Sequence, residues 1–302
     1  MKESKRYDRV HHADQASTLR RQFGSKAPQV KDLTRVMSVT SGKGGVGKTA
    51  TVVNVGLALG SLGKSVLLLD ADLGLANIDV LLGISPKKTI YDVLKGEASL
   101  SDVMIHCQSG LSIIPASSGV DVLSTLSAVE QARLLAEIEQ VAESFDYLLI
   151  DTKAGIDSDV MYFTSASNEV LVVINSEPTS LTDAYALIKL LTASYGERTF
   201  SIIANNVASE KEGRKAFEVL SRAVSHHLHG TLRYLGSVPR DELLRDSIRQ
   251  QRALLEVYPS SPAARAFTQL AAKIESEPPQ IQVKGGMQFF FRQLLEMQSY
   301  GG

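Results

Sequence analysis

The sequence predicts an α/β fold, a mainly parallel, twisted sheet with helices on both faces. From residue 34 onward, short apolar runs alternate with longer stretches of helical spacing, as in repeated strand–helix units. The apolar runs lack the polar alternation of half-exposed strands, so we expect strands that are buried on both faces. The chain has 302 residues and 44% hydrophobic content, which is ample for such a core.

The expected elements follow one another in strand–helix order. Seven strands are predicted, at 35–39, 65–69, 111–114, 147–150, 169–174, 200–204 and 232–238. The longer helices are predicted at 49–63, 127–145, 180–196 and 211–228, and several of them close on glycine. Repeated units of this kind bring ligands to the C-terminal ends of the strands.

Charge and cysteine content exclude several classes of protein. Lys and Arg number 32 and Asp and Glu 33, so no global basic field would draw the chain onto nucleic acid. The single cysteine, Cys107, rules out a disulfide framework and a cysteine-built zinc or iron–sulfur site. There is no secretory apolar segment and no apolar run long enough to span a bilayer, so we expect a cytoplasmic protein.

Three regions are expected along the chain. Residues 1–33 form a polar leader, whose first 26 residues carry seven Lys and Arg against three acids. Residues 34–276 form the α/β domain, and 277–302 form a linker and an amphipathic helix. The apolar face of that helix would bind a lipid membrane or fold back onto the protein body. Its residues are Met287, Phe290, Phe291, Leu294 and Leu295.

A phosphate-binding loop lies between the first strand and the first helix. Gly42, Gly47, Lys48 and Thr49 fulfil the pattern G-x-x-x-x-G-K-[ST]. Backbone N–H groups would surround the phosphate, Lys48 would neutralise its oxygens, and the Thr49 hydroxyl would bind Mg²⁺. The residues expected to hold the nucleotide are Gly42, Gly44, Gly45, Val46, Gly47, Lys48, Thr49 and Ala50.

The same loop contains a second lysine, Lys43, that phosphate binding does not require. The stretch KGGVGKT resembles the signature of the MinD/ParA/NifH family of deviant Walker A ATPases. In that family the additional lysine crosses an ATP-sandwiched homodimer to the partner's nucleotide, so the resemblance implies a catalytic role in trans for Lys43. The alternative is a solvated loop lysine. The single cysteine argues against the iron–sulfur branch.

Three acids follow buried strands and complete the expected Mg²⁺–ATP site. Asp70 and Asp72 stand two residues apart after the strand at 65–69, and Asp151 follows the strand at 147–150. By resemblance Asp72 orients or deprotonates the attacking water, while Asp70 and Asp151 hold Mg²⁺. Asp70 or Asp72 would otherwise cap the following turn. Lys153 replaces the small residue of the usual DTGAGI pattern, which puts the hydrolysis rate in question but not nucleotide binding.

The base is expected to lie beside two later strand ends. In MinD-like proteins an asparagine at the position of Asn205 bonds to adenine, and a Val-Pro segment packs on the ring. The resemblance therefore assigns base contacts to Asn205, Pro239, Arg240 and Asp241. No N-K-x-D guanine motif occurs, so ATP and ADP with Mg²⁺ are the expected cofactors.

Features outside the site favour one branch of the family. DQASTLRR, LLLDADLGLANIDVLLGI and EPTSLTDAYALIKLL resemble segments of the flagellar number regulators FlhG and FleN. The resemblance implies a slow ATPase switch that controls flagellar number or placement and joins the membrane, at the cell pole, when ATP is bound. A MinD-type division-site regulator and a ParA-like DNA-positioning ATPase are the alternatives.

The same resemblance implies partners. The leader would stimulate a signal-recognition-like GTPase of the FlhF type, with Gln15 as the key residue beside Asp14, Leu19 and Arg20. A second copy of the chain, the lipid membrane, and flagellar switch proteins or a flagellar transcription regulator are the other expected partners. Nucleic acid is not expected as one.

Overall fold

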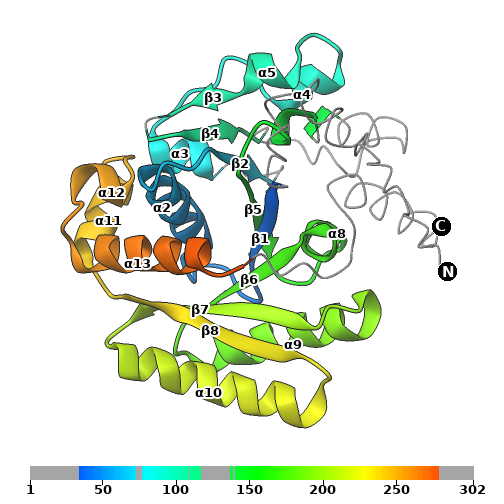
Figure 1. The fold of residues 1–302 in the computed structure, drawn as a ribbon, viewed down its shortest axis with the longest axis vertical. Coiled ribbons are helices and arrows are strands. Elements are labelled where there is room, and N and C mark those ends of the chain that lie inside the picture. The colour runs from blue at the N-terminus through cyan, green and yellow to red at the C-terminus, as the bar shows by residue number, and fades with distance from the viewer. Residues whose placement is uncertain (1–33, 73–76, 108, 117–136, 139, 279–302) are drawn as a thin grey trace, which may run out of the picture. The chain divides into compact units, whose positions relative to one another are not determined.

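The computed structural model describes residues 34–72, 77–107, 109–116, 137–138 and 140–278 (Figure 1). The chain divides into two units, 1–32 and 33–302, and all described residues belong to the second. The predicted leader and the predicted tail helix lie outside the described residues, so their boundaries stay predictions. In the described part of the chain, no helix is long and apolar enough to cross a membrane.

An eight-stranded sheet forms the centre of the fold, in the order β3-β4-β2-β5-β1-β6-β7-β8. The strands are β1 Arg35–Ser41, β2 Val66–Asp70, β3 Ile105–His106, β4 Leu111–Ile114, β5 Tyr147–Ala154, β6 Glu169–Ile174, β7 Thr199–Val207 and β8 Thr231–Pro239. All neighbours are parallel except β3, which is antiparallel to β4. The predicted fold class is confirmed, and each predicted strand is present.

Helices cover both faces of the sheet (Figure 1). Alternate strand residues enter two layers of core, because successive side chains of a strand point to opposite faces. The helices are α2 Lys48–Ser61, α3 Ile78–Leu82, α4 Ile90–Leu94, α5 Leu100–Val103, α8 Ser158–Ala166, α9 Pro178–Tyr195, α10 Glu210–His227, α11 Glu242–Arg249, α12 Leu254–Val257 and α13 Pro262–Ser276. On one face the core includes α2, α12 and α13, and on the other it includes α4, α5, α8, α9 and α10.

Two sequence expectations need correction. The run at 232–238 was expected to be buried on both faces, but most of β8 is only partly buried. The reason is its position, since β8 ends the sheet and pairs only with β7. The two-residue strand β3 and the short helices α3, α4, α5, α11 and α12 were not predicted from periodicity. The predicted helix at 127–145 lies largely outside the described residues.

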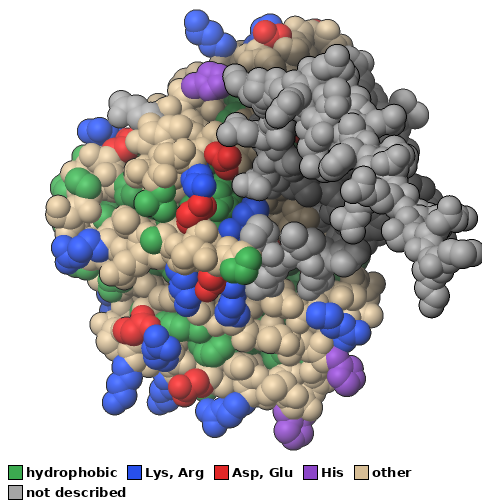
Figure 2. Space-filling view, in the orientation of Figure 1, with side chains coloured by type: hydrophobic (Ala, Val, Ile, Leu, Met, Phe, Trp, Pro, Cys, Tyr) green, Lys and Arg blue, Asp and Glu red, His purple; other side chains and the backbone are tan. Residues whose placement is uncertain are grey.

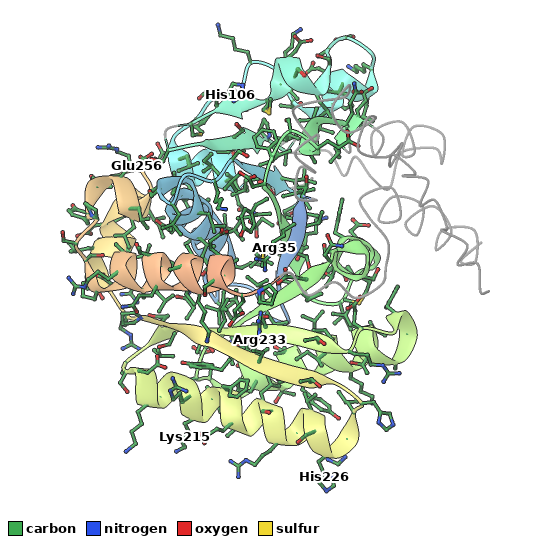
Figure 3. All side chains as sticks on the ribbon, in the orientation of Figure 1. Arg35, His106, Lys215, His226, Arg233 and Glu256 are labelled. Carbon is green, nitrogen blue, oxygen red and sulfur yellow. The ribbon has the colours of Figure 1, made fainter. Side chains whose placement is uncertain are left out.

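Two arginines, Arg35 and Arg233 (labelled in Figure 3), form ion pairs that hold the end of α13 against the sheet. Arg35 begins β1, binds Glu169 at 2.6 Å, and donates to the carbonyl of Ile274 at 2.7 Å. Arg233 binds Glu277 just beyond the helix. The Arg35 side chain thus satisfies a carbonyl that the end of the helix leaves without an intrahelical donor, and Arg233 binds the Glu277 carboxylate beyond it.

Candidate nucleotide-binding site

The phosphate loop joins β1 to α2, and its glycines meet different steric demands. Gly45 and Gly47 have φ of 77° and 87°, the left-handed region that disfavours side chains. Gly42 has ordinary dihedrals, but a Cβ there would lie 2.2 Å from the Asp183 carbonyl carbon of α9. The loop therefore lies tightly against α9 on one side. At Gly44 and Gly45 a Cβ would meet nothing within 4 Å, so this side of the loop is open.

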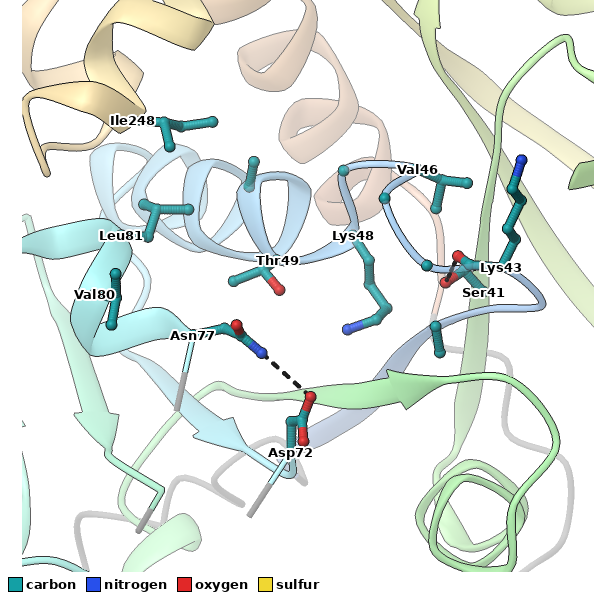
Figure 4. Close-up of a pocket in the computed structure, with 15 residues that line it drawn as sticks. Ser41, Lys43, Val46, Lys48, Thr49, Asp72, Asn77, Val80, Leu81 and Ile248 are labelled. Atoms are coloured by element: carbon teal, nitrogen blue, oxygen red, sulfur yellow. Dashed lines mark hydrogen bonds between the residues drawn. The ribbon is translucent and has the colours of Figure 1, made fainter. Parts of the chain in front are cut away.

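A cavity of about 450 Å³ opens at the loop (Figure 4), a volume typical of small-molecule sites. Its lining residues are Ser41, Lys43, Gly44, Gly45, Val46, Gly47, Lys48, Thr49, Ala50, Asp72, Asn77, Val80, Leu81, Ala154 and Ile248. Most of the predicted loop residues and Asp72 are thus brought together. Gly42, Asp70, Asp151, Asn205 and residues 239–241 are not in this lining.

Sequence reasoning missed an apolar rim, Val80 and Ile248, whose exposed fractions are 58% and 40%. Val80 is in the DADLGLANIDVLLG motif, in which only the acids have a predicted role. Ile248 comes from the unpredicted helix α11, so no signal pointed to it. Exposed apolar residues at the mouth of a polar cavity are a surface that a partner can cover.

Lys48 and Asp151 form a buried ion pair beneath the cavity. Their Nζ and Oδ1 atoms are 2.5 Å apart, and the Asp151 side chain is fully buried. The second oxygen, Oδ2, is also buried and has no hydrogen-bond partner among the described residues. A buried carboxylate oxygen without a donor is an oxygen ligand available to a cation.

Asp70 holds the segment that follows β2. Its carboxylate accepts hydrogen bonds from the backbone N–H groups of Asp72, Asn77 and Ile78 at 3.1–3.3 Å. It pairs in register with Asp151 across β2 and β5. Burial, followed by the charge of Asp151, raises the pKa of Asp70 to about 7. Asp70 thus makes backbone contacts of the kind that the capping alternative describes, and its predicted Mg²⁺ contact stays a prediction.

Asp72 is directed into the same space as Lys48 and Thr49 (Figure 4). The Asn77 side-chain amide donates to its Oδ2 at 3.2 Å. Asp72 and Asn77 are the ends of the gap at 73–76, which lies outside the described residues. Asp72 thus faces the phosphate loop across the cavity, and its role toward the attacking water stays a prediction.

Lys43 points away from Lys48 (Figure 4). Its Nζ lies 2.8 Å from Glu177 Oε2 and 3.0 Å from Thr179 Oγ1, at the start of α9. The hydrogen bond and the charge of Lys43 lower the pKa of the Glu177 carboxyl. Both partners are exposed, with side-chain fractions of 38% and 59%, so the contact is open to exchange. Lys43 and Lys48 thus have separate partners.

The residues predicted to contact the base have protein partners in this structure. Asn205 donates from Nδ2 to the Val46 carbonyl at 2.7 Å. Asp241 caps α11 through the Leu243 N–H and accepts from the Ala263 N–H at 3.0 Å. The Arg240 N–H donates to the Val207 carbonyl. Pro239 ends β8. Their roles toward adenine stay predictions.

Lys153, which replaces a small residue in the DTGAGI pattern, lies at the end of β5. Its Nζ is 4.0 Å from Asp159 Oδ2, and it is not among the residues that line the cavity. In this arrangement its charge is directed toward the start of α8 rather than toward the phosphate loop.

The donor set fits a Mg²⁺–nucleotide. The open side of the loop leaves room for phosphates, Lys48 supplies a cation, and Asp151 presents an oxygen to which no described residue donates. Among the described residues, no group of three or more His, Cys, Asp or Glu could hold a metal ion alone. Mg²⁺ fits such a sparse site, because it keeps several waters and takes further ligands from phosphates.

Comparisons with known proteins agree with this geometry. Residues 34–199 match the family model described as AAA domain. The antiactivator FleN of Pseudomonas aeruginosa is 43% identical over 93% of this chain and 99% of its own. The flagellum site-determining protein YlxH of Helicobacter pylori is 35% identical over 94% of this chain and 98% of its own.

Solved structures give the same result. The cell division ATPase MinD of Pyrococcus furiosus has a TM-score of 0.67 and 28% identity, covering 80% of this chain and 99% of its own. MinD of Pyrococcus horikoshii, complexed with Mg-ADP, has a TM-score of 0.68 and 26% identity, covering 84% and 99%. The predicted recognition is confirmed: this chain belongs to the MinD/ParA-type deviant Walker A ATPases, whose cofactors are ATP or ADP and Mg²⁺, and within that family it resembles FlhG and FleN.

Proposed function

We propose that this chain is an ATP-hydrolysing switch that dimerises with ATP and regulates flagellar number or placement. Support for the flagellar branch comes from two relatives matched over nearly their whole length, the antiactivator FleN and the flagellum site-determining YlxH. The observation that best supports a switch function is that the two lysines of the loop have separate partners. Lys48 pairs with Asp151 inside the site, whereas Lys43 is directed outward and held by α9.

Within one subunit the residues have distinct tasks. Bound Mg²⁺ would neutralise phosphate charge, held by Thr49 and Asp151 with Asp70 nearby. Lys48 and the loop N–H groups would bind the phosphates, and Asp72 would orient the attacking water and accept its proton. Hydrolysis consumes this water and ATP and releases ADP and phosphate. Because Lys43 is directed away from its own site, one subunit alone would hydrolyse ATP slowly.

Lys43 would complete the site of the other subunit. Its contact with Glu177 and Thr179 is exposed, so moving the ammonium to a phosphate costs little. At the γ-phosphate of the partner it would offset charge that grows in the transition state, as an arginine finger does. The exposed Val80 and Ile248 at the mouth of the cavity would be covered in the same dimer.

Replacement of Lys43 tests this role. Lys43→Ala should abolish ATP-dependent dimerisation, measured by light scattering, while nucleotide binding by the monomer persists. Lys64→Ala is a matched control, because Lys64 is similarly exposed, at 33%, and pairs with Glu275 at 2.5 Å. The control should dimerise like the wild type. Unchanged dimerisation of Lys43→Ala would exclude the role in trans.

The predicted tail helix would bring the dimer to the membrane. One helix with little net positive charge binds lipid weakly, so two tails in a dimer would be needed for stable attachment. Deletion of residues 285–302 should release the ATP-bound protein from anionic vesicles. Phe290→Ser/Phe291→Ser should do the same, whereas Gln288→Ser/Gln293→Ser on the polar face should not. Undiminished vesicle binding after the deletion would mean that the tail is not the anchor.

The leader would act on an FlhF-type GTPase. A peptide of residues 1–26 should accelerate GTP hydrolysis by that protein, and Gln15→Ala should remove the acceleration. Gln22→Ala is the control within the same peptide and should remain active. If the wild-type peptide did not accelerate GTP hydrolysis, this function of the leader would be wrong, whereas the proposed ATPase function would still stand.

A division-site role is the second candidate, because the similar solved structures named above are MinD proteins. This role predicts that the protein works without its leader and that the leader has no effect on the flagellar GTPase.

A ParA-like role requires a basic surface. Lys and Arg are interspersed with Asp and Glu on the face seen in Figure 2, and the whole chain has a formal net charge of −1. Salt-sensitive binding of DNA by the dimer would favour that alternative.

A further inference from the structure

Asn205 connects β7 to the phosphate loop. The Asn205 side chain is buried, with 3% exposure, and its Nδ2 lies 2.7 Å from the carbonyl oxygen of Val46. The acceptor is a carbonyl, so only the NH₂ group of the amide can make this bond, which determines the orientation of the side chain. The two residues are 159 positions apart, and the bond ties the loop to a strand of the sheet.

The end of β7 is irregular where Asn205 makes this contact. The pairing of β7 with β8 shifts register between Asn205 and Val207. Asn206 has φ of 56°, in the left-handed region that asparagine tolerates, and is exposed while both of its neighbours are buried. An irregularity of this kind re-aims a side chain at the end of a strand.

The bond has a consequence for the next residue of the loop. In a trans peptide the C=O of one residue and the N–H of the next point in opposite directions within one plane. Holding the Val46 carbonyl against Asn205 therefore turns the Gly47 N–H to the opposite side, and Gly47 lines the cavity. A loop N–H directed into the cavity is a donor for phosphate oxygen.

We infer that Asn205 is a positioning residue for phosphate binding, which keeps the Val46–Gly47 peptide in the orientation that presents the Gly47 N–H to a phosphate. This inference rests on the nucleotide-binding function of the site. Gly47 is adapted to the same contact, because a Cβ there would lie 2.2 Å from Asn205 Nδ2. On its other side the loop is anchored by the Val46 side chain, which is 3% exposed in the core.

The oxygen of the Asn205 amide separates this role from a role in stability. Asn205 Oδ1 is buried and has no hydrogen-bond partner among the described residues. A buried acceptor without a donor costs folding free energy. An apolar residue of similar size would avoid that cost but would release the Val46 carbonyl. Asn205 therefore orients the loop at a cost in folding free energy.

Inorganic triphosphate with Mg²⁺ distinguishes this role from the predicted adenine contact, because triphosphate has no base. Asn205→Ala and Asn205→Asp both lack the NH₂ donor, and the second keeps the shape of the side chain. If the Gly47 N–H is lost as a donor to a charged ligand, affinity for triphosphate and for ATP should each fall about tenfold to a hundredfold in titration calorimetry.

The outcomes are separable. Loss of ATP affinity with unchanged triphosphate affinity would overturn the inference and assign Asn205 to the base alone. Unchanged affinity for both ligands would also overturn it. Failure of the wild type to bind either ligand would instead refute the nucleotide-binding function.

Asn54 provides a matched control for the loss of a buried amide. Its side chain is 1% exposed and donates from Nδ2 to the Ala50 carbonyl at 2.8 Å, within α2 and away from the Val46–Gly47 peptide. Asn54→Ala should lower the melting temperature but leave triphosphate affinity within about twofold of wild type. If both asparagine variants weakened triphosphate binding equally, the effect would be general destabilisation and the inference would be wrong.

Discussion

The ammonium of Lys48 lies 2.5 Å from the carboxylate of Asp151, and both groups are almost completely buried. In this arrangement the phosphate-binding cation and the predicted Mg²⁺ ligand neutralise each other. A Mg²⁺–nucleotide would offer each of them a new partner, a phosphate for Lys48 and a cation for Asp151. Nucleotide binding would therefore exchange one buried charge pair for two others, and neither group would be left without a partner.

This pair predicts that, without nucleotide, substitutions of Lys48 and Asp151 have strongly non-additive effects on the free energy of unfolding. Lys48→Met leaves a buried carboxylate without its cation and should lower the free energy of unfolding by about 3–5 kcal/mol. Lys48→Met/Asp151→Asn removes both charges and should recover most of that loss. Urea unfolding of the nucleotide-free protein measures both values. If the effects of the single substitutions simply add in the double variant, the pair is not coupled as its geometry indicates.

The Lys43–Glu177 contact predicts a shifted titration. Lys43 stabilises the ionised carboxylate, so the pKa of Glu177 is lower than its usual value. The contribution of the contact is present above the ordinary glutamate pKa and is lost as the pH falls through the lowered one. Lys43→Ala should raise the pKa of Glu177 toward its usual value, as read from the side-chain carboxyl carbon by NMR. An unshifted titration in the variant would mean that the two groups do not interact in solution.

The Arg35 cluster predicts a large loss of stability from one arginine and little from another. Arg35→Met leaves the buried Glu169 without its cation and removes the donor to the Ile274 carbonyl at the end of α13. The free energy of unfolding should fall by about 3–5 kcal/mol. Arg245 pairs with Glu242 on the exposed surface of α11, so Arg245→Met should change it by less than about 1 kcal/mol. Equal effects in urea unfolding would show that burial does not decide the strength of these pairs.

The strands could be predicted because their sequence signal is local. Unbroken apolar runs such as 169–174 mark strands covered on both faces, and β6 indeed lies inside the sheet. The position of β8 in the sequence was predicted correctly, but its burial was not, because a sequence does not state which strand ends the sheet. β3 is two residues long, too short for any period to be visible. The helix α11 supplied Ile248 to the site without an advance signal.

The site likewise has one part that the sequence could predict and another that only the structure shows. The loop from Gly42 to Thr49 is contiguous, so its spacing alone identified it. The contacts that set the side chains are distant in sequence. Lys43 and Glu177 are separated by 134 positions, and Lys48 and Asp151 by 103. The resemblance to known ATPases supplied roles for single residues, whereas these pairings depend on how β5 and α9 lie beside β1 and could be found only in the folded chain.

Gly42 and Gly44 provide a comparison within one loop. Neither has a positive φ, so the difference between them is the space around each residue. A Cβ at position 42 would lie 2.2 Å from Asp183 and 2.5 Å from the Ala184 nitrogen, both backbone atoms of α9. Backbone cannot move aside as a flexible side chain can, so Gly42→Ala must push the loop away from α9. We expect a loss of about 1–3 kcal/mol in the free energy of unfolding.

Gly44→Ala is the control for that substitution, because a Cβ at position 44 meets nothing within 4 Å. Without nucleotide it should change the free energy of unfolding by less than about 1 kcal/mol, since a compatible alanine mainly restricts the unfolded chain. Hydrogen exchange should locate the difference, with faster exchange in the first turns of α9 for Gly42→Ala and not for Gly44→Ala. If the two alanines were equally tolerated, the close approach of the loop to α9 would not exist in solution. The contact of Lys43 with Glu177 and Thr179 would then be unexplained, because it too requires the loop to lie against α9.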